Sequence, residues 1–410
     1  MRGGLMSKHV TDTVTFRHGA KIDSRIVMPP MLTFSGSEGG FATEDTIRYY
    51  SARSKAASLL ITEFHYMTPT GGPCSVPGYP EQLSIQDDQH LDSIKAIATA
   101  LKQDGNKAIL QIHHGGREAM GRAAKGKEVL APSALDFSFL SYPVREMTNE
   151  EIEGIIQDFG KATKRAIDAG FDGVEIHGAN HYLIQQFFSA TSNIRTDKWG
   201  GSLEKRMTFA LEVVKEVKRV IAEHAPKDFI IGYRISPEEI HGSVVGYTYK
   251  ESMQLIAEIA KYELDYISLS IWGGYDASPK GVDKSFGQLF KEVVGEETKI
   301  IVVGSVFNEA DAQDAVEHHT DLIAVGRGTL IDPLFGQKIK DGQGDTIVSE
   351  ISPEQVEKIS WTAGLNEVFT RADSLGLPPL PGHDSILHLH KGLFSEAAAI
   401  GSGSATSGSD

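Results

Sequence analysis

The chain has 410 residues, of which 40% are hydrophobic, and a formal net charge of -15. This acidic balance disfavours nucleic acids and anionic membranes as partners, because both are bound through clustered Lys and Arg side chains. The single cysteine, Cys74, excludes an intramolecular disulfide, a cysteine-ligated iron–sulfur cluster and a CxxC zinc site. There is no signal-peptide pattern and no run of 18 apolar residues, so we expect a soluble, cytoplasmic protein.

Short apolar runs alternate with helical patterns along most of the chain, after a small hairpin expected from Val14 onward. The runs are rich in Ile, Val and Leu and lack strict polar alternation, which is typical of parallel strands covered on both faces. Eight strands are expected to start at or near Ile26, Leu59, Ala108, Val174, Phe229, Tyr266, Ile300 and Leu322. Helices are expected at about 45–57, 88–102, 148–169, 202–223, 249–261, 284–294 and 309–318.

Eight such strand–helix units predict an α/β fold, a (β/α)₈ TIM barrel. A doubly wound open sheet is the alternative, although its GxGxxG signature is absent after the first strand. We expect the barrel to occupy residues 1–344. A strong helix start at Ser352 predicts a helix running to Arg371, within an appended helical segment over 345–400. Residues 401–410, GSGSATSGSD, have the composition of a flexible tail.

Ligands of a parallel barrel are held at the carboxyl ends of its strands, so the residues that follow each predicted strand are the candidates for a site. Along the chain these are Pro29, Pro30, Met31 and Leu32; Glu63 and Phe64; Gln111, His113 and His114; His177, Asn180 and Tyr182; Arg234; Gly304 and Ser305; Gly326 and Arg327. Neighbouring histidines on a strand point to opposite faces and share a metal ion poorly. We therefore predict no metal site.

The end of the fourth strand carries three polar side chains within six residues, His177, Asn180 and Tyr182, before a helical apolar pattern that begins at Leu183. Their concentration at one strand end favours a binding site. The simpler alternative is that they are loop residues hydrogen-bonded to the backbone.

Two further sets of strand-end residues suggest parts of a ligand. Gln111 and Arg234 are costly to bury unpaired, and a flat heterocycle with carbonyl and ring-nitrogen acceptors would satisfy both. The alternative is a backbone hydrogen bond for Gln111 and a structural salt bridge for Arg234. The glycines after strands seven and eight, Gly304 and Gly326, suit backbone binding of a phosphate, aided by Arg327.

Six stretches, taken together in this order and spacing, resemble the old yellow enzyme family of FMN-dependent ene-reductases, in particular its bacterial NAD(P)H-dependent flavin oxidoreductases. They are RIVMPPM, LQIHHGGR, GFDGVEIHGANHYLIQQFFS, SNIRTDKWGGSLEKR, YRISPEE and IAVGRG. The resemblance covers roughly residues 14–336. It implies non-covalent FMN, NADH or NADPH as reductant, and a small-molecule acceptor such as an α,β-unsaturated carbonyl compound or a quinone.

The resemblance also implies a role for each candidate residue. Residues 29–32 and Phe64 would line the isoalloxazine ring, Gln111 would bind its pyrimidine edge, and Arg234 would lie near N1 and O2. Gly304, Ser305, Gly326 and Arg327 would hold the phosphate. His177 and Asn180 would bind the substrate carbonyl oxygen, and Tyr182 would donate the proton.

Two positions depart from the family pattern. Leu32 stands where many members have a Thr or Cys that bonds the flavin O4, which predicts altered redox tuning. Phe34 stands where a related subgroup has a substrate-contacting Tyr. Two other functions stay open on the residues alone: a lyase or isomerase of a phosphorylated metabolite without flavin, and a catalytically idle flavin carrier. Association into a homo-oligomer is possible, but no interface pattern indicates it.

Overall fold

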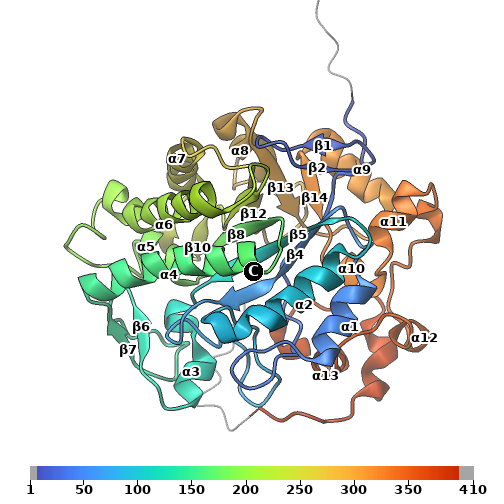
Figure 1. Ribbon diagram of the computed structural model, residues 1–410, viewed down its shortest axis with the longest axis horizontal. Coiled ribbons are helices and arrows are strands. Elements are labelled where there is room, and N and C mark those ends of the chain that lie inside the picture. The colour runs from blue at the N-terminus through green and yellow to red at the C-terminus, as the bar shows by residue number, and fades with distance from the viewer. Residues whose placement is uncertain (1–6, 397–410) are drawn as a thin grey trace, which may run out of the picture.

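The structure, a computed structural model, describes residues 7–396. Eight parallel strands form a closed barrel at the centre of the molecule (Figure 1). The barrel strands are β3 (Ile26–Met28), β4 (Leu59–Tyr66), β5 (Lys107–His113), β8 (Gly173–Gly178), β9 (Ile230–Ile235), β12 (Tyr266–Leu269), β13 (Lys299–Val303) and β14 (Leu322–Ala324). Each pairs in parallel with two neighbours, and β14 closes the ring against β3. The predicted TIM barrel is confirmed, and the doubly wound sheet is excluded.

Helices surround the strands (Figure 1). They are α1 (Glu44–Ala52), α2 (Leu91–Lys102), α4 (Asn149–Asp168), α6 (Leu203–His224), α7 (Tyr249–Ala260), α8 (Phe286–Val294) and α9 (Glu309–His318), followed by α11 (Phe335–Lys340). Helix α4 begins as its sequence predicts: Thr148 Oγ1 accepts the Glu151 N–H at 3.2 Å, and Glu151 accepts the Thr148 N–H at 2.8 Å. Its buried stripe, including Ile152, Ile155 and Phe159, recurs at helical spacing and packs toward the barrel.

An antiparallel hairpin closes the amino-terminal end of the barrel. It consists of β1 (Val14–Thr15) and β2 (Lys21–Ile22). Phe16, at its turn, lies in one buried cluster with the inward-facing Ile109 and Ile230. Because apolar side chains fill this end, the opposite end, where the strands finish, is the one that can admit a ligand.

The last barrel strand is shorter than its sequence suggests. The apolar run over 321–328 predicts a strand, but β14 ends at Ala324 and helix α10 (Arg327–Ile331) follows. The Val325 N–H still bonds to the Val27 carbonyl at 2.8 Å, and the Leu330 N–H then bonds to the Gly326 carbonyl at 3.1 Å. Gly326 is therefore the N-cap of a helix, and Arg327 opens that helix instead of ending a strand.

The described part of the segment after the barrel contains two short α-helices, so the prediction of one helix to Arg371 is wrong. These are α12 (Pro353–Val356), capped by Ser352 as expected, and α13 (Ala363–Phe369). Between them Ser360 has a φ of 52°, which breaks the helix. The break lets Trp361 turn inward, where its indole N–H donates to the Leu330 carbonyl at 3.0 Å.

This carboxyl-terminal segment packs directly on the loop that follows β3. Thr362 Oγ1 donates to the Thr33 carbonyl at 2.5 Å, and Arg53 donates to the Ile359 carbonyl at 3.0 Å. A Cβ on Gly364 would lie 2.1 Å from the Phe34 carbonyl oxygen, so the two backbones are in close contact. The predicted tail over 401–410 lies outside the described residues.

Short helices and strands lie within the loops between the barrel strands. Helix α5 (Leu183–Phe188) follows β8, as the apolar pattern there predicts. The pairs β6 (Val129–Ala131) with β7 (Val144–Glu146) and β10 (Glu239–His241) with β11 (Val244–Tyr247), and the helix α3 (Met120–Ala124), were not expected. Each is too short to give a periodic signal in the sequence.

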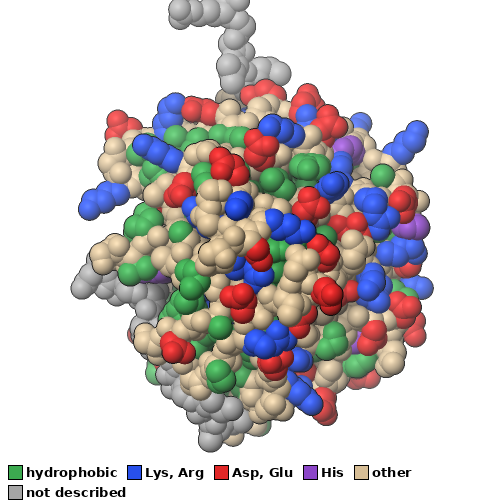
Figure 2. Space-filling model, turned by 90° about the vertical axis from the view of Figure 1, so that its left-hand side faces the viewer, with side chains coloured by type: hydrophobic (Ala, Val, Ile, Leu, Met, Phe, Trp, Pro, Cys, Tyr) green, Lys and Arg blue, Asp and Glu red, His purple; other side chains and the backbone are tan. Residues whose placement is uncertain are grey.

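The surface agrees with the mixed, acidic composition. Figure 2 shows acidic and basic side chains interspersed over one face of the molecule. Among residues 7–396, no helix combines the length and apolar character needed to cross a membrane.

Candidate functional site

A layer of polar side chains lies inside the barrel, above the apolar layer that contacts the hairpin. Ile109 and Ile230 point inward, and strand side chains alternate between faces, so Gln111 and Arg234 point inward as well. Register places Gln111 beside Glu175 and Arg234 beside Ser268. All of these polar side chains are buried.

Hydrogen bonds satisfy this layer only in part. Gln111 Nε2 donates to Glu175 Oε1 at 2.6 Å, and Arg234 Nη1 donates to Ser268 Oγ at 2.9 Å. The other oxygen of Gln111 is buried and has no partner within residues 7–396, whereas the nearby Tyr266 hydroxyl lowers the pKa of Glu175. Burial raises the pKa of Glu175, which Arg234 opposes, and burial lowers the pKa of Arg234, which Glu175 opposes. The layer therefore has unused capacity for a bound polar group.

Four rings cluster at the ends of β4, β5 and β8. Phe64, His113, His177 and Tyr182 all contact one another, with ring centroids 4.3 to 5.7 Å apart. The shortest contact is edge to face between His113 and Tyr182. Sequence reasoning placed Phe64, His177 and Tyr182 at one site, and the structure brings these three together.

His177 is a neutral hydrogen-bond donor in this cluster. Burial and the nearby Arg234 lower the pKa of His177 well below its ordinary value. Its Nδ1 accepts the Ala179 N–H at 3.3 Å, so in the neutral ring the proton is on Nε2. His177 can thus donate one hydrogen bond without carrying charge.

Tyr182 keeps its proton at neutral pH, because burial raises the pKa of its hydroxyl well above the ordinary value. Beside it, His113 is fully buried; its Nε2 lies 3.4 Å from Cys74 Sγ, and its Nδ1 has no partner among the described residues. Burial, with His177 and His114 nearby, lowers the pKa of His113 well below its usual value. The rings that contact Tyr182 are therefore uncharged, and the nearby Glu118 raises the pKa of its hydroxyl further.

Asn180 differs from its two predicted companions in being exposed. It has a φ of 58°, and its backbone N–H donates to Ser236 Oγ, beyond the end of β9, at 3.0 Å. The next residue, His181, also has a positive φ, of 63°. Within residues 7–396, no hydrogen bond joins the side chains of Asn180 and His177.

A buried acid within β4 holds the loop after β3 in place. The acid is Glu63, which accepts the Thr33 Oγ1–H at 2.5 Å and the Leu83 N–H at 3.3 Å. Burial raises the pKa of Glu63 to about 7. In the same loop, Phe34 is buried and its ring lies 6.2 Å from that of Tyr79. Phe34 is thus a core residue.

The loops after β3 and β14 meet. A Cβ on Gly326 would lie 3.4 Å from Pro29 Cγ and 3.5 Å from Met31 Sδ, so these predicted site residues are neighbours. Pro29 is buried, whereas Pro30, Met31 and Leu32 are partly exposed.

A second tight turn follows β13. Gly304 and Ser305 have φ values of 143° and 53°, and a Cβ on Gly304 would lie 2.6 Å from the Gly273 carbonyl oxygen. Glycine at such a turn lets the backbone come close to a ligand, as phosphate-binding loops of barrels require. Arg327 lies half-buried, with its guanidinium 5.0 Å from the centre of the Phe307 ring and 3.0 Å from the Pro379 carbonyl oxygen.

These residues fit the FMN that the sequence motifs imply. The pyrimidine edge of a flavin presents an N–H donor between two carbonyl acceptors. The unpartnered Gln111 Oε1 is an acceptor for that donor, and Arg234 with the second Gln111 N–H supplies donors for the carbonyls. The turn at Gly304 is a fitting cradle for the phosphate.

Sequence reasoning assigned no role to two residues of the site. His113 was named only as a strand-end residue, and Glu175 was not among the candidates. Alternation along the strands gives the signal that finds both: Glu175 lies two residues before His177, and His113 two residues after Gln111, on the same inward faces.

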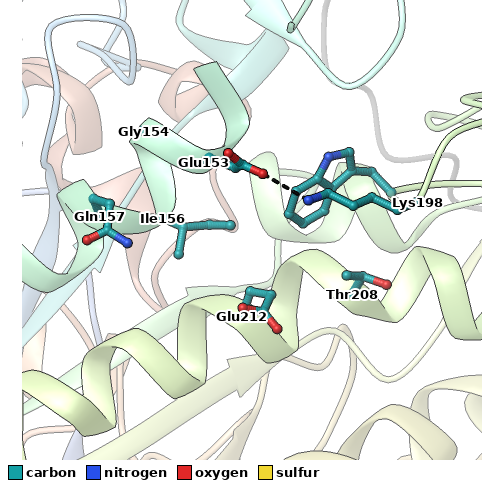
Figure 3. A pocket seen from close by; sticks show the side chains of 8 residues that line it. Glu153, Gly154, Ile156, Gln157, Lys198, Thr208 and Glu212 are labelled. Atoms are coloured by element: carbon teal, nitrogen blue, oxygen red, sulfur yellow. Dashed lines mark hydrogen bonds and ion pairs between the residues drawn. The ribbon is translucent and has the colours of Figure 1, made fainter. Parts of the chain in front are cut away.

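Other features contribute no competing site. No group of three potential metal-ligating side chains occurs within residues 7–396. A surface pocket between α4 and α6 is lined by Glu153, Gln157, Glu212 and Lys198, with Lys198 paired to Glu153 at 2.8 Å (Figure 3). It lies on the outer helices, away from the polar layer inside the barrel.

Comparison with known proteins gives a consistent result. A family model described as "NADH:flavin oxidoreductase / NADH oxidase family" matches residues 14–346. The chain is 39% identical over 353 residues to the probable NADH-dependent flavin oxidoreductase YqiG of Bacillus subtilis, covering 86% of this chain and 93% of that protein.

It is also 38% identical over 360 residues to the NADH:acrylate oxidoreductase of Vibrio harveyi, covering 85% of this chain but 35% of that longer protein. Among solved structures, morphinone reductase in complex with tetrahydroNAD has a TM-score of 0.70 and 25% identity, covering 87% of this chain and 97% of that chain.

Proposed function

This chain belongs to the NADH:flavin oxidoreductase / NADH oxidase family, and on that premise we propose that its barrel mouth reduces activated alkenes. The protein is an NAD(P)H-dependent FMN oxidoreductase of the old yellow enzyme type. We take the acceptor to be an α,β-unsaturated carbonyl compound or a quinone-like molecule. The acrylate named for the Vibrio harveyi relative is of this class.

FMN, when bound, supplies hydride transfer from NAD(P)H to the β-carbon of the acceptor. Residues of this chain that would hold it are Gln111 and Arg234 at the pyrimidine edge, the loop 29–32 and Phe64 along the ring, and Gly304, Ser305, Gly326 and Arg327 at the phosphate. The support is the unpartnered Gln111 oxygen and the positive-φ turn at Gly304.

We assign His177 and Asn180 to the carbonyl oxygen of the acceptor. His177 is neutral and protonated on Nε2, so it can donate to that oxygen without placing a competing charge there. Two donors on one oxygen stabilise the negative charge that develops when hydride reaches the β-carbon. Asn180 is exposed at the same strand end, which leaves its amide free to reach a ligand.

Tyr182 is assigned the proton transfer to the α-carbon. Its raised pKa keeps the hydroxyl protonated at the pH of the reaction, as a general acid requires. The observation that carries the proposal is the contact of Tyr182 with His177, whose ring centroids are 5.1 Å apart, because it joins a neutral donor and a protonated acid at one strand end.

The phosphate-binding lyase alternative would need a lysine or a free carboxylate as base at a strand end. Of the acids considered there, Glu63 already accepts hydrogen bonds from Thr33 and Leu83. Glu175 is fully buried and bonded to Gln111.

The test is an anaerobic titration of purified protein containing FMN with NADH and with NADPH, followed by addition of 2-cyclohexenone, acrylate or a quinone. We expect one nicotinamide to bleach the flavin absorbance and an acceptor of this class to restore it. A protein that takes up no FMN, or whose flavin is reduced but never reoxidised by any of these acceptors, would contradict the proposal.

We further propose a cytoplasmic location, because the nicotinamide reductant is available there and the one cysteine is a buried free thiol. We also propose that residues 1–344 form the FMN-binding unit, with 345–400 as an appended helical segment whose Thr362 donates to the Thr33 carbonyl. Cell fractionation tests the first point. Size-exclusion chromatography reports whether copies of the chain associate.

A further inference from the structure

Glu175 has no role in the reaction described so far, yet among the described residues it is the one carboxylate of the polar layer inside the barrel. It is fully buried on β8, between Gln111 on β5 and Gly232 on β9. Burying a carboxylate costs free energy unless it is paired, because the charged group loses its hydration. A buried carboxylate at a binding site therefore suggests a functional role.

Its contact with Gln111 fixes which way the Gln111 amide faces. Gln111 Nε2 donates to Glu175 Oε1 at 2.6 Å, so the NH₂ group of Gln111 faces the carboxyl group of Glu175. The Gln111 carbonyl oxygen is thereby turned away from Glu175 and is left buried without a partner in the described chain. A buried acceptor held in this way is ready for a donor from a ligand.

The second consequence is electrostatic. Glu175 and Arg234 lie in the same layer, and each opposes the effect of burial on the other's pKa. Arg234 is itself hydrogen-bonded to the neutral Ser268. An ionised Glu175 would offset part of the positive charge that Arg234 places at the inner end of the site.

We propose that Glu175 is a positioning residue for the flavin: it holds Gln111 with its oxygen toward the pyrimidine N–H of FMN, and its charge lowers the reduction potential of the bound cofactor. This inference rests on the proposed function, since it requires FMN at this site. It assigns Glu175 to the cofactor and not to the acceptor.

Two substitutions separate the two effects. Glu175→Gln keeps an acceptor for the Gln111 amide but removes the charge, so we expect a higher flavin reduction potential with little change in FMN affinity. Glu175→Leu removes both, frees the Gln111 amide to rotate, and should weaken FMN binding roughly fivefold to tenfold, the usual effect of losing one hydrogen bond. Potentials are measured by equilibration with a reference dye, and affinities by the recovery of flavin fluorescence on release.

A double-mutant comparison tests whether Glu175 acts through Gln111. If it does, Glu175→Leu should weaken FMN binding in the wild-type background but add nothing in a Gln111→Ala background. Glu367→Gln is the matched control: Glu367 is also buried and accepts the Lys391 and Leu393 N–H groups, but it lies on α13. The control should leave both potential and affinity unchanged.

The inference is overturned if Glu175→Gln leaves the potential at the wild-type value, or if Glu175→Leu costs the same affinity with and without Gln111. If Glu175→Leu fails to fold, the flavin reduction potential of Glu175→Gln, compared with those of the wild type and of Gln111→Ala, still tests the inference. A wild-type protein that binds no FMN would instead overturn the proposed function, so the two failures are distinguishable.

Discussion

The ring of Tyr182 meets the ring of His113 edge to face, with 4.3 Å between their centroids and an angle of 84° between their planes. His113 is fully buried and contacts Phe64 and His177 as well. The imidazole thus fixes the position of Tyr182 mainly through packing.

We expect His113→Ala to slow alkene reduction, because Tyr182 loses the ring that positions it. The same change should lower the free energy of unfolding by about 3 kcal/mol, as removal of a buried ring does. His113→Phe restores a ring of similar shape and should recover most of both losses. Stopped-flow reoxidation of the flavin and thermal unfolding measure the two effects. If His113→Phe proves as slow as His113→Ala, the polar atoms of the imidazole are needed and the packing account is wrong.

Replacement of Gly304 should weaken cofactor binding. An alanine there would carry a φ of 143° and place Cβ 2.6 Å from the Gly273 carbonyl oxygen, so the turn must shift. Strain of this kind costs about 1–3 kcal/mol, so Gly304→Ala should raise the FMN dissociation constant about tenfold or more. Gly154→Ala on α4, where a Cβ meets nothing within 4 Å, is the control and should leave the FMN dissociation constant unchanged. Equal FMN affinity in Gly304→Ala would argue against a phosphate at this turn.

Glu63 should make the protein less stable as the pH rises through neutrality. Burial raises the pKa of Glu63 to about 7 from 4.5, so the native state holds this proton longer than the unfolded state does. The contribution of protonated Glu63 to the free energy of unfolding is complete below pH 4.5 and is lost as the pH rises through 7. The loss is at most about 1.4 kcal/mol per pH unit.

Glu63→Gln has no proton to lose in this range. Between pH 4.5 and pH 7.5 the free energy of unfolding of the wild type should therefore fall relative to that of Glu63→Gln, as measured in urea. A constant difference between the two proteins across this range would show that Glu63 does not titrate as described.

His177 should not impose a pH dependence on alkene reduction near neutrality. Its pKa lies well below the ordinary value, so the imidazole stays neutral at pH 6.5 and above. Rates of flavin reoxidation in the wild type and in His177→Asn should therefore run parallel from pH 6.5 to pH 8, the variant being slower throughout. An inflection near pH 6.5 that disappears in His177→Asn would contradict a neutral His177.

The fold could be read largely from the sequence, because each barrel strand is a local apolar run. The runs at Leu59 and Tyr266, for example, begin where their strands begin. The break at Ser360 could not be predicted, since it depends on the burial of Trp361 against Leu330, a contact between segments distant in the chain. Likewise, nothing local to Arg327 shows that it opens a helix.

The sequence predicts which strand ends contribute residues to the site, but not which of those side chains contact one another. His177 and Tyr182 follow one strand, so their proximity is local and was expected. That His113 packs on Tyr182, and that Glu175 bonds Gln111, depends on the register between β5 and β8, which only the closed barrel defines. Family motifs supplied roles but not these contacts.

The most direct test of the central claim is double-mixing stopped-flow on Tyr182→Phe, reducing the flavin with nicotinamide and then adding 2-cyclohexenone. We predict unchanged flavin reduction and a reoxidation about 100-fold slower or more, because only the second step needs the Tyr182 proton. Tyr142→Phe is the control: Tyr142 packs in the same side-chain cluster, but its hydroxyl donates to the Arg117 carbonyl at 2.7 Å. Reoxidation of Tyr182→Phe at the wild-type rate would contradict the account.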